Sequence, residues 1–423
     1  MKLVYVINKY GKPLMPTQRA GKVRRLLNAK LAKVIEYEPF TIQLLYDTTD
    51  FIQELNLGVD TGSRNVGCSV TSVTKEVFAA LIILRTDISK LLSDKRMRRR
   101  ARRNRLRYRQ AKFSNRVHSK KKGWLPPSIQ HRIESHIRIM KYIQGILPIK
   151  NIYIELTEFD TQKMTDEFIE SEEYQRGNLL GFKNVKEFVK WRDNFTCQNC
   201  HGKSGDNKLE VHHIQQRKDM GSDRPDNLVC LCHTCHEEYH QGKITLKKFS
   251  YLNRKNAASL RDAAIMNVIK TEIYNRAKEE FKDCNVYYTY GYITKHNRQK
   301  YNIEKSHCAD ARVISKNFNA EPLGYYYYGK FFRRHNRQIY KDKIIKGGRR
   351  VKAQANNDVY GFYPYHRVKY NKTVCFTSGR RTSGSFELKK LDNTVVHTGI
   401  SYKKIKKIHG TKRLIFSRFL YRG

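Results

Sequence analysis

Runs of apolar residues predict strands and a helix near the start of the chain. Residues 3–7 and 41–46 are rich in Val, Ile and Leu, and the stretch after Thr17 has the pattern of a helix. We therefore expect a small α/β module over residues 1–54.

Three further apolar runs follow at residues 55–59, 66–73 and 76–84, separated by short turn signals. This spacing predicts an antiparallel meander. The same periodicities predict helices over residues 129–143, 263–281 and 304–317, strands over 151–156 and 286–293, and short strands in the Tyr-rich region from residue 321.

The charge of the chain indicates a polyanionic partner. Among 423 residues, 84 Lys and Arg stand against 39 Asp and Glu, so the formal net charge is 84 − 39 = +45. Nucleic acid is the expected partner, and an anionic membrane is the alternative. The apolar runs are shorter than the about 20 residues of a transmembrane helix, and residues 4–7 are too short for a signal peptide. We expect a prokaryotic cytoplasmic, nucleoid-associated protein.

Two Cys-x-x-Cys pairs indicate a structural zinc site. Nine Cys is an odd number, and four of them form the pairs Cys197/Cys200 and Cys232/Cys235. Four thiolates suit a closed tetrahedral Zn²⁺ site, and in a reducing compartment metal is favoured over disulfides. The alternative is two incidental pairs of buried Cys.

A histidine pair lies between the two Cys pairs, and two more histidines follow them. His212 and His213 fall in a strand-like run, whereas His236 and His240 have the i, i+4 spacing of one helix face. We expect a ββα arrangement in which the strand pair faces the helix.

This Cys/His module resembles the HNH nucleases whose ββα core is held by a zinc ribbon. The resemblance implies that His213 is the general base, that His212 and His236 hold one Mg²⁺, and that Asn227 orients the loop and the base. Whether His240 is a further ligand stays open. The alternative for His213 is a histidine that completes the zinc site or packs in a core.

Three acidic residues mark a second candidate site. Asp60 and Glu155 each end an apolar strand, and Asp310 falls on a predicted helix three residues after His307. Taken singly, each acid is explained by a solvated element boundary. Together they resemble the RuvC-type nucleases of the RNase H fold, which implies catalytic roles for all four residues and two Mg²⁺ ions bound by the three carboxylates.

The order of these segments resembles the IscB family of transposon-encoded RNA-guided endonucleases, which are similar to CRISPR type II effectors. The sequence Pro-Leu-Met-Pro at residues 13–16 matches the motif of that family's PLMP domain. The resemblance implies an RNA-guided DNA endonuclease in which the HNH domain cuts the guide-paired strand and RuvC cuts the displaced strand. Its partners would be one long structured guide RNA per protein and duplex DNA with a target-adjacent motif.

The resemblance implies an α+β multidomain protein with a split RNase H-like (RuvC) mixed α/β core, an inserted ββα HNH domain with a zinc ribbon, and a β-rich basic C-terminal domain. The expected boundaries are: PLMP domain 1–54, RuvC segment I 55–94, Arg-rich bridge helix 95–122, RuvC segment II 123–160, acidic linker 161–181, HNH domain 182–243, RuvC segment III 244–320, and the C-terminal domain that contacts RNA and the target-adjacent motif 321–423.

Basic residues in two of these regions are candidates for binding phosphates. They are Arg96, Arg99, Arg100, Arg103, Arg107, Arg349, Arg350, Arg380 and Arg381. The alternative for the Arg-rich segment is a disordered basic linker, and the run of Tyr at 325–328 is explained better by β-sheet packing than by base stacking.

Two other functions remain open from the sequence. One is a protein-guided HNH endonuclease of the homing or restriction type, which would cut without RNA. The other is a catalytically weak, RNA-guided DNA-binding protein.

Overall fold

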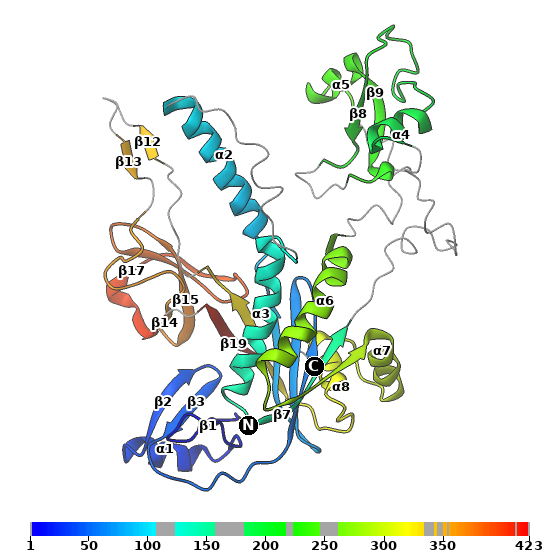
Figure 1. Cartoon of the computed structure of the whole chain (residues 1–423). Helices are drawn as coiled ribbons and strands as arrows, with labels where there is room; N and C mark the ends of the chain where they lie inside the picture. Colours follow the sequence, from blue (N-terminus) through cyan, green and yellow to red (C-terminus); the bar gives the residue numbers. More distant parts are fainter. Residues whose placement is uncertain are drawn as a thin grey trace. The chain divides into compact units, whose positions relative to one another are not determined.

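The computed structural model forms two compact units (Figure 1). Unit 1 comprises Met1–Thr157 and Val268–Gly423, and unit 2 comprises Glu158–Asn267. The structure describes residues 2–106, 123–156, 182–216, 223–245, 261–333, 342–344, 350–352, 355–410 and 413–421. The expected acidic linker and residues 107–122 of the expected bridge helix lie outside the described residues.

The helices are α1 (Ala20–Asn28), α2 (Ile88–Leu106), α3 (Pro127–Gln144), α4 (Val185–Arg192), α5 (His233–His240), α6 (Arg261–Glu280), α7 (Gly291–Lys300) and α8 (His307–Ile314), with 3-10 turns η3 (Pro225–Asn227) and η5 (Tyr402–Lys404). The strands are β1 (Tyr5–Ile7), β2 (Ala32–Tyr37), β3 (Phe40–Leu44), β4 (Leu55–Asp60), β5 (Asn65–Thr71), β6 (Glu76–Ile83), β7 (Ile149–Leu156), β8 (Leu209–His213), β9 (Leu228–Cys232), β10 (Asn285–Tyr290), β11 (Tyr325–Phe331), β12 (Asp342–Ile344), β13 (Arg350–Lys352), β14 (Arg367–Tyr370), β15 (Thr373–Arg380), β16 (Ser385–Lys389), β17 (Val395–Ser401), β18 (Lys406–His409) and β19 (Leu414–Leu420).

A seven-stranded sheet forms the centre of unit 1, in the order β10-β7-β4-β5-β6-β11-β19. Strands β4, β5 and β6 are antiparallel neighbours, which confirms the predicted meander. Strand β7 pairs in parallel with β4, and β10 pairs in parallel with β7. Leu55, Leu57 and Val59 lie on one face of β4 and are fully buried, while α8 contacts the opposite face at Gly58.

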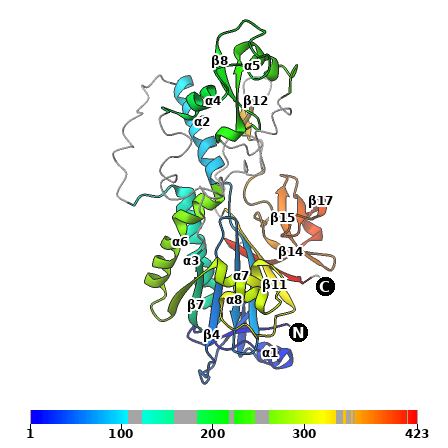
Figure 2. The same ribbon diagram turned by 90° about the vertical axis from the view of Figure 1, so that its right-hand side faces the viewer.

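Two glycines let helix α8 approach this sheet closely. A Cβ atom on Gly58 of β4 would lie 1.9 Å from the Ala311 carbonyl oxygen, and one on Gly67 of β5 would lie 2.1 Å from the His307 carbonyl oxygen. Any larger residue would therefore push α8 away. Figure 2 shows α8 and α7 side by side against one face of the sheet, where α8 packs on β4 and β5.

The N-terminal module is a three-stranded sheet in the order β1-β3-β2, with β1 parallel to β3. Strand β2 was not expected from the sequence, because Lys33, Glu36 and other polar residues interrupt its apolar pattern. The module is tied to the rest of unit 1 by the Tyr5 hydroxyl, which donates to the Val77 carbonyl at 3.0 Å. Glu38 adds an ion pair to Arg367 at 2.9 Å.

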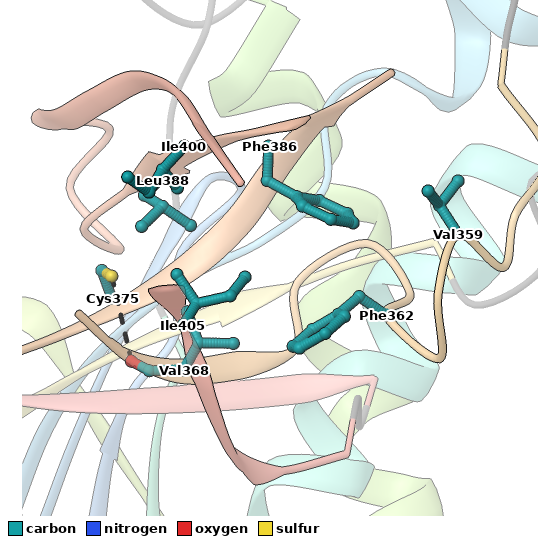
Figure 3. Packing of buried hydrophobic residues seen from close by; sticks show 8 residues of the cluster. All are labelled: Val359, Phe362, Val368, Cys375, Phe386, Leu388, Ile400 and Ile405. Carbon is teal, nitrogen blue, oxygen red and sulfur yellow. Dashed lines mark hydrogen bonds between the residues drawn. The ribbon is translucent and has the colours of Figure 1, made fainter. Parts of the chain in front are cut away.

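The C-terminal region contains the short strands that the sequence predicts. Five of them form a sheet in the order β17-β16-β15-β14-β18. Figure 3 shows its core, in which Phe362 and Phe386 pack beside smaller apolar side chains and the Cys375 thiol points at the Val368 carbonyl, 3.8 Å away. The Tyr-rich run belongs to β11, where Tyr325 and Tyr327 are buried, so its prediction as sheet packing is confirmed.

Two predicted boundaries differ from the structure. The strand expected to reach residue 293 ends at Tyr290, and helix α7 begins at Gly291. Because Tyr and Ile favour strands, the residue pattern at the start of this helix did not predict it. The helix expected over 304–317 is shorter, because the Ser306 side chain caps its first turn by accepting from the Ala309 amide at 3.1 Å.

Helix α2 also begins before the expected bridge-helix boundary at residue 95. None of the helices within the described ranges is long and apolar enough to cross a membrane.

Adding a methyl group at Gly67 should destabilise the protein. We expect Gly67→Ala to lower the free energy of unfolding by about 2 kcal/mol or more, because the new Cβ would collide with the backbone of α8. Gly21→Ala is the matched control: Gly21 lies in helix α1 with open space around its Cβ position. Urea denaturation that shows equal stability for both variants would contradict the proposed close contact.

A buried histidine should make unit 1 sensitive to acid. His136 is fully buried in α3, its Nδ1 donates to the Arg132 carbonyl at 2.8 Å, and burial lowers the pKa of its ring to about 4. The unfolded state therefore binds a proton between pH 6.5 and 4 that the folded state does not, and stability falls as pH falls through that range.

Between pH 7 and pH 5 this one group should cost about 2 kcal/mol of stability. His136→Gln should show a pH dependence smaller by that amount in urea denaturation at the two pH values. An unchanged pH dependence would show that the pKa of His136 in the folded protein is close to its value in the unfolded chain.

Candidate functional sites

Four thiols converge in unit 2. The sulfur atoms of Cys197, Cys200, Cys232 and Cys235 all lie within 4.8 Å of one another. Cys232 precedes α5, and its sulfur accepts from the Cys235 amide at 3.5 Å, so the helix start fixes two of the four thiols. Burial raises the pKa of Cys235 to about 12. A divalent cation would reverse that shift, and the tetrahedral thiolate set fits Zn²⁺.

A histidine cluster lies on the adjoining strand and helix. Strand β8 pairs antiparallel with β9, and α5 packs on both, which is the expected ββα arrangement. The ligand atoms of His212, His236 and His240 all lie within 4.8 Å of one another, and the Nε2 atoms of His236 and His240 are 3.3 Å apart. The structure therefore brings His240 into the cluster.

Contacts of the Nδ1 atoms orient the rings of His212 and His236. His212 Nδ1 donates to the His213 carbonyl at 2.8 Å, and His236 Nδ1 lies 3.0 Å from Glu210 Oε2. With the proton on Nδ1 in both rings, Nε2 is the unprotonated nitrogen and carries the lone pair that can bind a metal ion. Burial, followed by the neighbouring histidines, lowers the pKa of His212 to about 4, and burial also lowers the pKa of His236. Neutral imidazoles of this kind fit a divalent metal ion.

The expected base lies beside this cluster. His213 Nε2 donates to Asp223 Oδ1 at 2.8 Å, which leaves Nδ1 as a proton acceptor. Asn227 is 1% exposed, and its amide exchanges two hydrogen bonds of 2.9 Å with the Gln215 backbone. Asn227 thereby holds the loop that follows His213.

The three acids of unit 1 lie at one end of the central sheet. Val59 of β4 pairs with Ile154 of β7, so Asp60 and Glu155 are the next residues of two parallel neighbours. Helix α8 brings His307 to Asp60, with 2.6 Å between His307 Nδ1 and Asp60 Oδ2. Burial, followed by repulsion from Asp60, raises the pKa of Asp310.

Each of these acids has its own partner in the structure. The hydrogen bond to Asp60 raises the pKa of His307, Glu155 Oε2 accepts from the Thr294 hydroxyl at 2.6 Å, and Asp310 Oδ1 lies 3.2 Å from Arg298 Nε. Among the described residues, the groups whose ligand atoms all lie within 4.8 Å are the four thiols and the three histidines. The oxygen donors of the three acids are the type that Mg²⁺ prefers.

Four side chains that contact these sites are not predicted by the sequence pattern. Glu210 had a signal, because strand alternation places residues i and i+2 on one face and His212 follows it by two. Thr294 and Arg298 had none, since helix α7 was not predicted. Asp223 lies outside the predicted helices and strands, so no sequence pattern indicated its contact with His213.

The expected phosphate-binding arginines are placed as follows. Arg96 and Arg99 are exposed on helix α2, and Arg381 is exposed with contacts to Ser385 and Thr398. Arg380 is half-buried and donates to the Asn357 carbonyl at 3.2 Å. The side chains of Arg100, Arg103 and Arg350, and all of Arg107 and Arg349, lie outside the described residues.

A basic cavity of about 430 Å³ in unit 1 was also not predicted. Its lining includes Lys330, Lys389 and Lys390, together with Phe332 and Tyr365, whose ring centroids are stacked 3.8 Å apart. Cationic and aromatic groups together suit phosphates and bases.

Comparison with known proteins places the histidine cluster in a family. Residues 4–177 match a family described as RRXRR protein, and residues 197–242 match the HNH endonuclease family. A probable HNH endonuclease of Lactococcus phage SK1 is 39% identical over 69 residues, which cover 14% of this chain and 72% of the phage protein. The chain belongs to the HNH endonuclease family.

A second relative is matched over only a small part of its length. The type IV methyl-directed restriction enzyme EcoKMcrA of Escherichia coli strain K12 is 38% identical over 66 residues, and the match spans 14% of this chain and 24% of that enzyme. The chain therefore spans only a small part of that enzyme.

Two solved Cas9 structures show partial similarity to this HNH endonuclease. For Streptococcus thermophilus Cas9 in complex with AGGA PAM, the TM-score is 0.33 at 17% identity, covering 45% of this chain and 26% of that one. For the Type II-C Cas9 enzyme from Actinomyces naeslundii, the TM-score is 0.24 at 10% identity, covering 62% and 59%. Scores this low do not establish a common fold.

The zinc content of the protein should depend on the four thiols of the HNH domain. We expect about one zinc per chain by atomic emission spectrometry, and its loss in Cys232→Ser. Cys375→Ser is the matched control, because Cys375 is buried in the C-terminal sheet of unit 1. A Cys232→Ser protein that retains full zinc content would exclude the four-thiol site.

Proposed function

We propose that this HNH endonuclease is an RNA-guided DNA endonuclease of the IscB type with two hydrolytic sites. The proposal rests on one observation: chain segments that lie before and after the inserted unit 2 in the sequence come together in space. Asp60 and Glu155 precede the insertion, His307 and Asp310 follow it, and the sheet and α8 bring all four to one sheet end.

The topology of unit 1 supports a RuvC-type role for these residues. The order β10-β7-β4-β5-β6, with β5 antiparallel to both neighbours and β7 and β10 parallel to β4, is that of the RNase H fold to which RuvC-type nucleases belong. On this basis Asp60, Glu155 and Asp310 would hold Mg²⁺, which supplies the positive charge that offsets charge developing on the phosphate.

The histidine cluster supports a separate hydrolytic site in the HNH domain. His212, His236 and His240 would hold one divalent ion, and His213 Nδ1 would accept the proton of the attacking water. Asp223 holds the His213 ring in the tautomer that this step needs. We assign the HNH site to the guide-paired strand and the carboxylate site to the displaced strand.

RNA guidance is supported by the charge of the chain. A net charge of +45 needs a polyanion to offset it, and the exposed Arg96 and Arg99 and the basic cavity offer phosphate contacts on unit 1. A bound RNA supplies sequence recognition by base pairing.

A protein-guided restriction-type endonuclease is the second candidate. It is favoured by the similarity to EcoKMcrA, whose name states a methyl-directed restriction activity. That similarity covers 14% of this chain and 24% of EcoKMcrA, and a restriction-type function by itself gives no role to the acids of unit 1.

Strand-specific cleavage tests the proposal. With guide RNA and matched duplex DNA, His213→Ala should reduce cleavage of the guide-paired strand by about a hundredfold or more and leave the other strand cut. Asp60→Ala should have the opposite effect. His201→Ala and Asp283→Ala are matched controls, since both side chains are exposed in the same regions.

The readout is a denaturing gel with each DNA strand labelled separately. Sequence-specific cleavage by RNA-free protein would favour the restriction-type function instead. Loss of both cuts in either single variant would show that the two sites do not act independently.

A further inference from the structure

Helix α7 contacts two of the three acids from one of its faces. The Thr294 hydroxyl donates to Glu155 Oε2 at 2.6 Å, and Arg298 Nε lies 3.2 Å from Asp310 Oδ1. Residues at i and i+4 share a helix face, so one helix controls the surroundings of two expected metal ligands.

The Thr294 contact is almost fully buried. Thr294 is 4% exposed and Glu155 is 7% exposed. A metal ligand that loses a supporting hydrogen bond is oriented less firmly and binds metal less well. The hydroxyl therefore orients the Glu155 carboxyl group.

The Arg298 contact differs because it brings a permanent positive charge. The side chains of Arg298 and Asp310 are 16% and 18% exposed, so the pair is partly screened from water. Arg298 Nη1 also donates to the Ile303 carbonyl at 3.3 Å, which holds the guanidinium in place independently of Asp310. A fixed cation beside Asp310 weakens the attraction of that carboxylate for a second cation.

We infer that α7 sets the affinity of the three-carboxylate site for divalent metal. Thr294 strengthens binding by fixing the Glu155 ligand, and Arg298 weakens it by offsetting the charge of Asp310. Both are positioning residues, and the inference rests on the proposed function in one respect, namely that the three acids bind metal.

Mn²⁺ binding to the full chain, followed by electron paramagnetic resonance of the free ion, tests this inference without any cleavage. The relevant sites are those that Asp60→Ala removes. Thr294→Val should weaken Mn²⁺ binding at these sites roughly tenfold, whereas Thr294→Ser, which keeps the hydroxyl, should retain wild-type affinity.

Arg298→Gln should strengthen Mn²⁺ binding at the same sites by about tenfold, and Arg298→Lys should leave it near wild type. The matched control is Lys295→Gln, which removes one positive charge from an exposed position on α7 and should change little. Circular dichroism melting curves identify any variant that fails to fold.

Equal affinities for Arg298→Gln and Lys295→Gln would overturn the role of Arg298, and weaker binding in Arg298→Gln would show that Arg298 supports the metal instead. Wild-type affinity in Thr294→Val would overturn the role of Thr294. If Asp60→Ala removes no Mn²⁺ site, the proposed carboxylate site itself is wrong, and that result is distinct from the others.

Discussion

The close contact between helix α8 and strands β4 and β5 is the constraint on which the carboxylate site depends. Gly58 and Gly67 have no side chain at the points where the α8 backbone comes nearest. This approach brings His307 within hydrogen-bonding distance of Asp60. A helix held farther away by ordinary side chains would leave Asp310 and His307 out of reach of the strand acids.

The same closeness creates an electrostatic problem, because it gathers negative charge in a partly buried place. Each acid has its own partner: Asp60 contacts the His307 ring, Glu155 accepts a hydrogen bond from the Thr294 hydroxyl, and Asp310 forms an ion pair with Arg298. The histidine cluster of unit 2 has no such problem. A neutral imidazole does not repel its neighbours, and the Glu210 carboxylate lies beside the His236 ring, so the His212, His236 and His240 nitrogens can gather closely.

Much of this arrangement was predictable from the sequence. The β4–β6 meander, the long apolar strand β7 and the two Cys pairs each have a strong local pattern, and the i, i+4 spacing of His236 and His240 indicated a shared helix face. Helix α7 was not predictable, because its first turn is Tyr- and Ile-containing and reads as a continuation of β10. The partners Thr294 and Arg298 were not predictable either, because both lie on this helix and the Thr294–Glu155 contact joins residues far apart in the sequence.

The position of unit 2 in the chain follows from how the central sheet is built. Strand β7 ends at Leu156, the chain returns through α6, and β10 then pairs in parallel with β7. Parallel neighbours always require a crossover connection, and the entropic cost of lengthening such a connection grows only slowly with its length. The register of Thr289 against Glu155 is set by the pairing of the two strands and by their buried side chains. An entire HNH domain can therefore be inserted in the crossover without moving the carboxylates, which is why two sites of different chemistry can share one short chain.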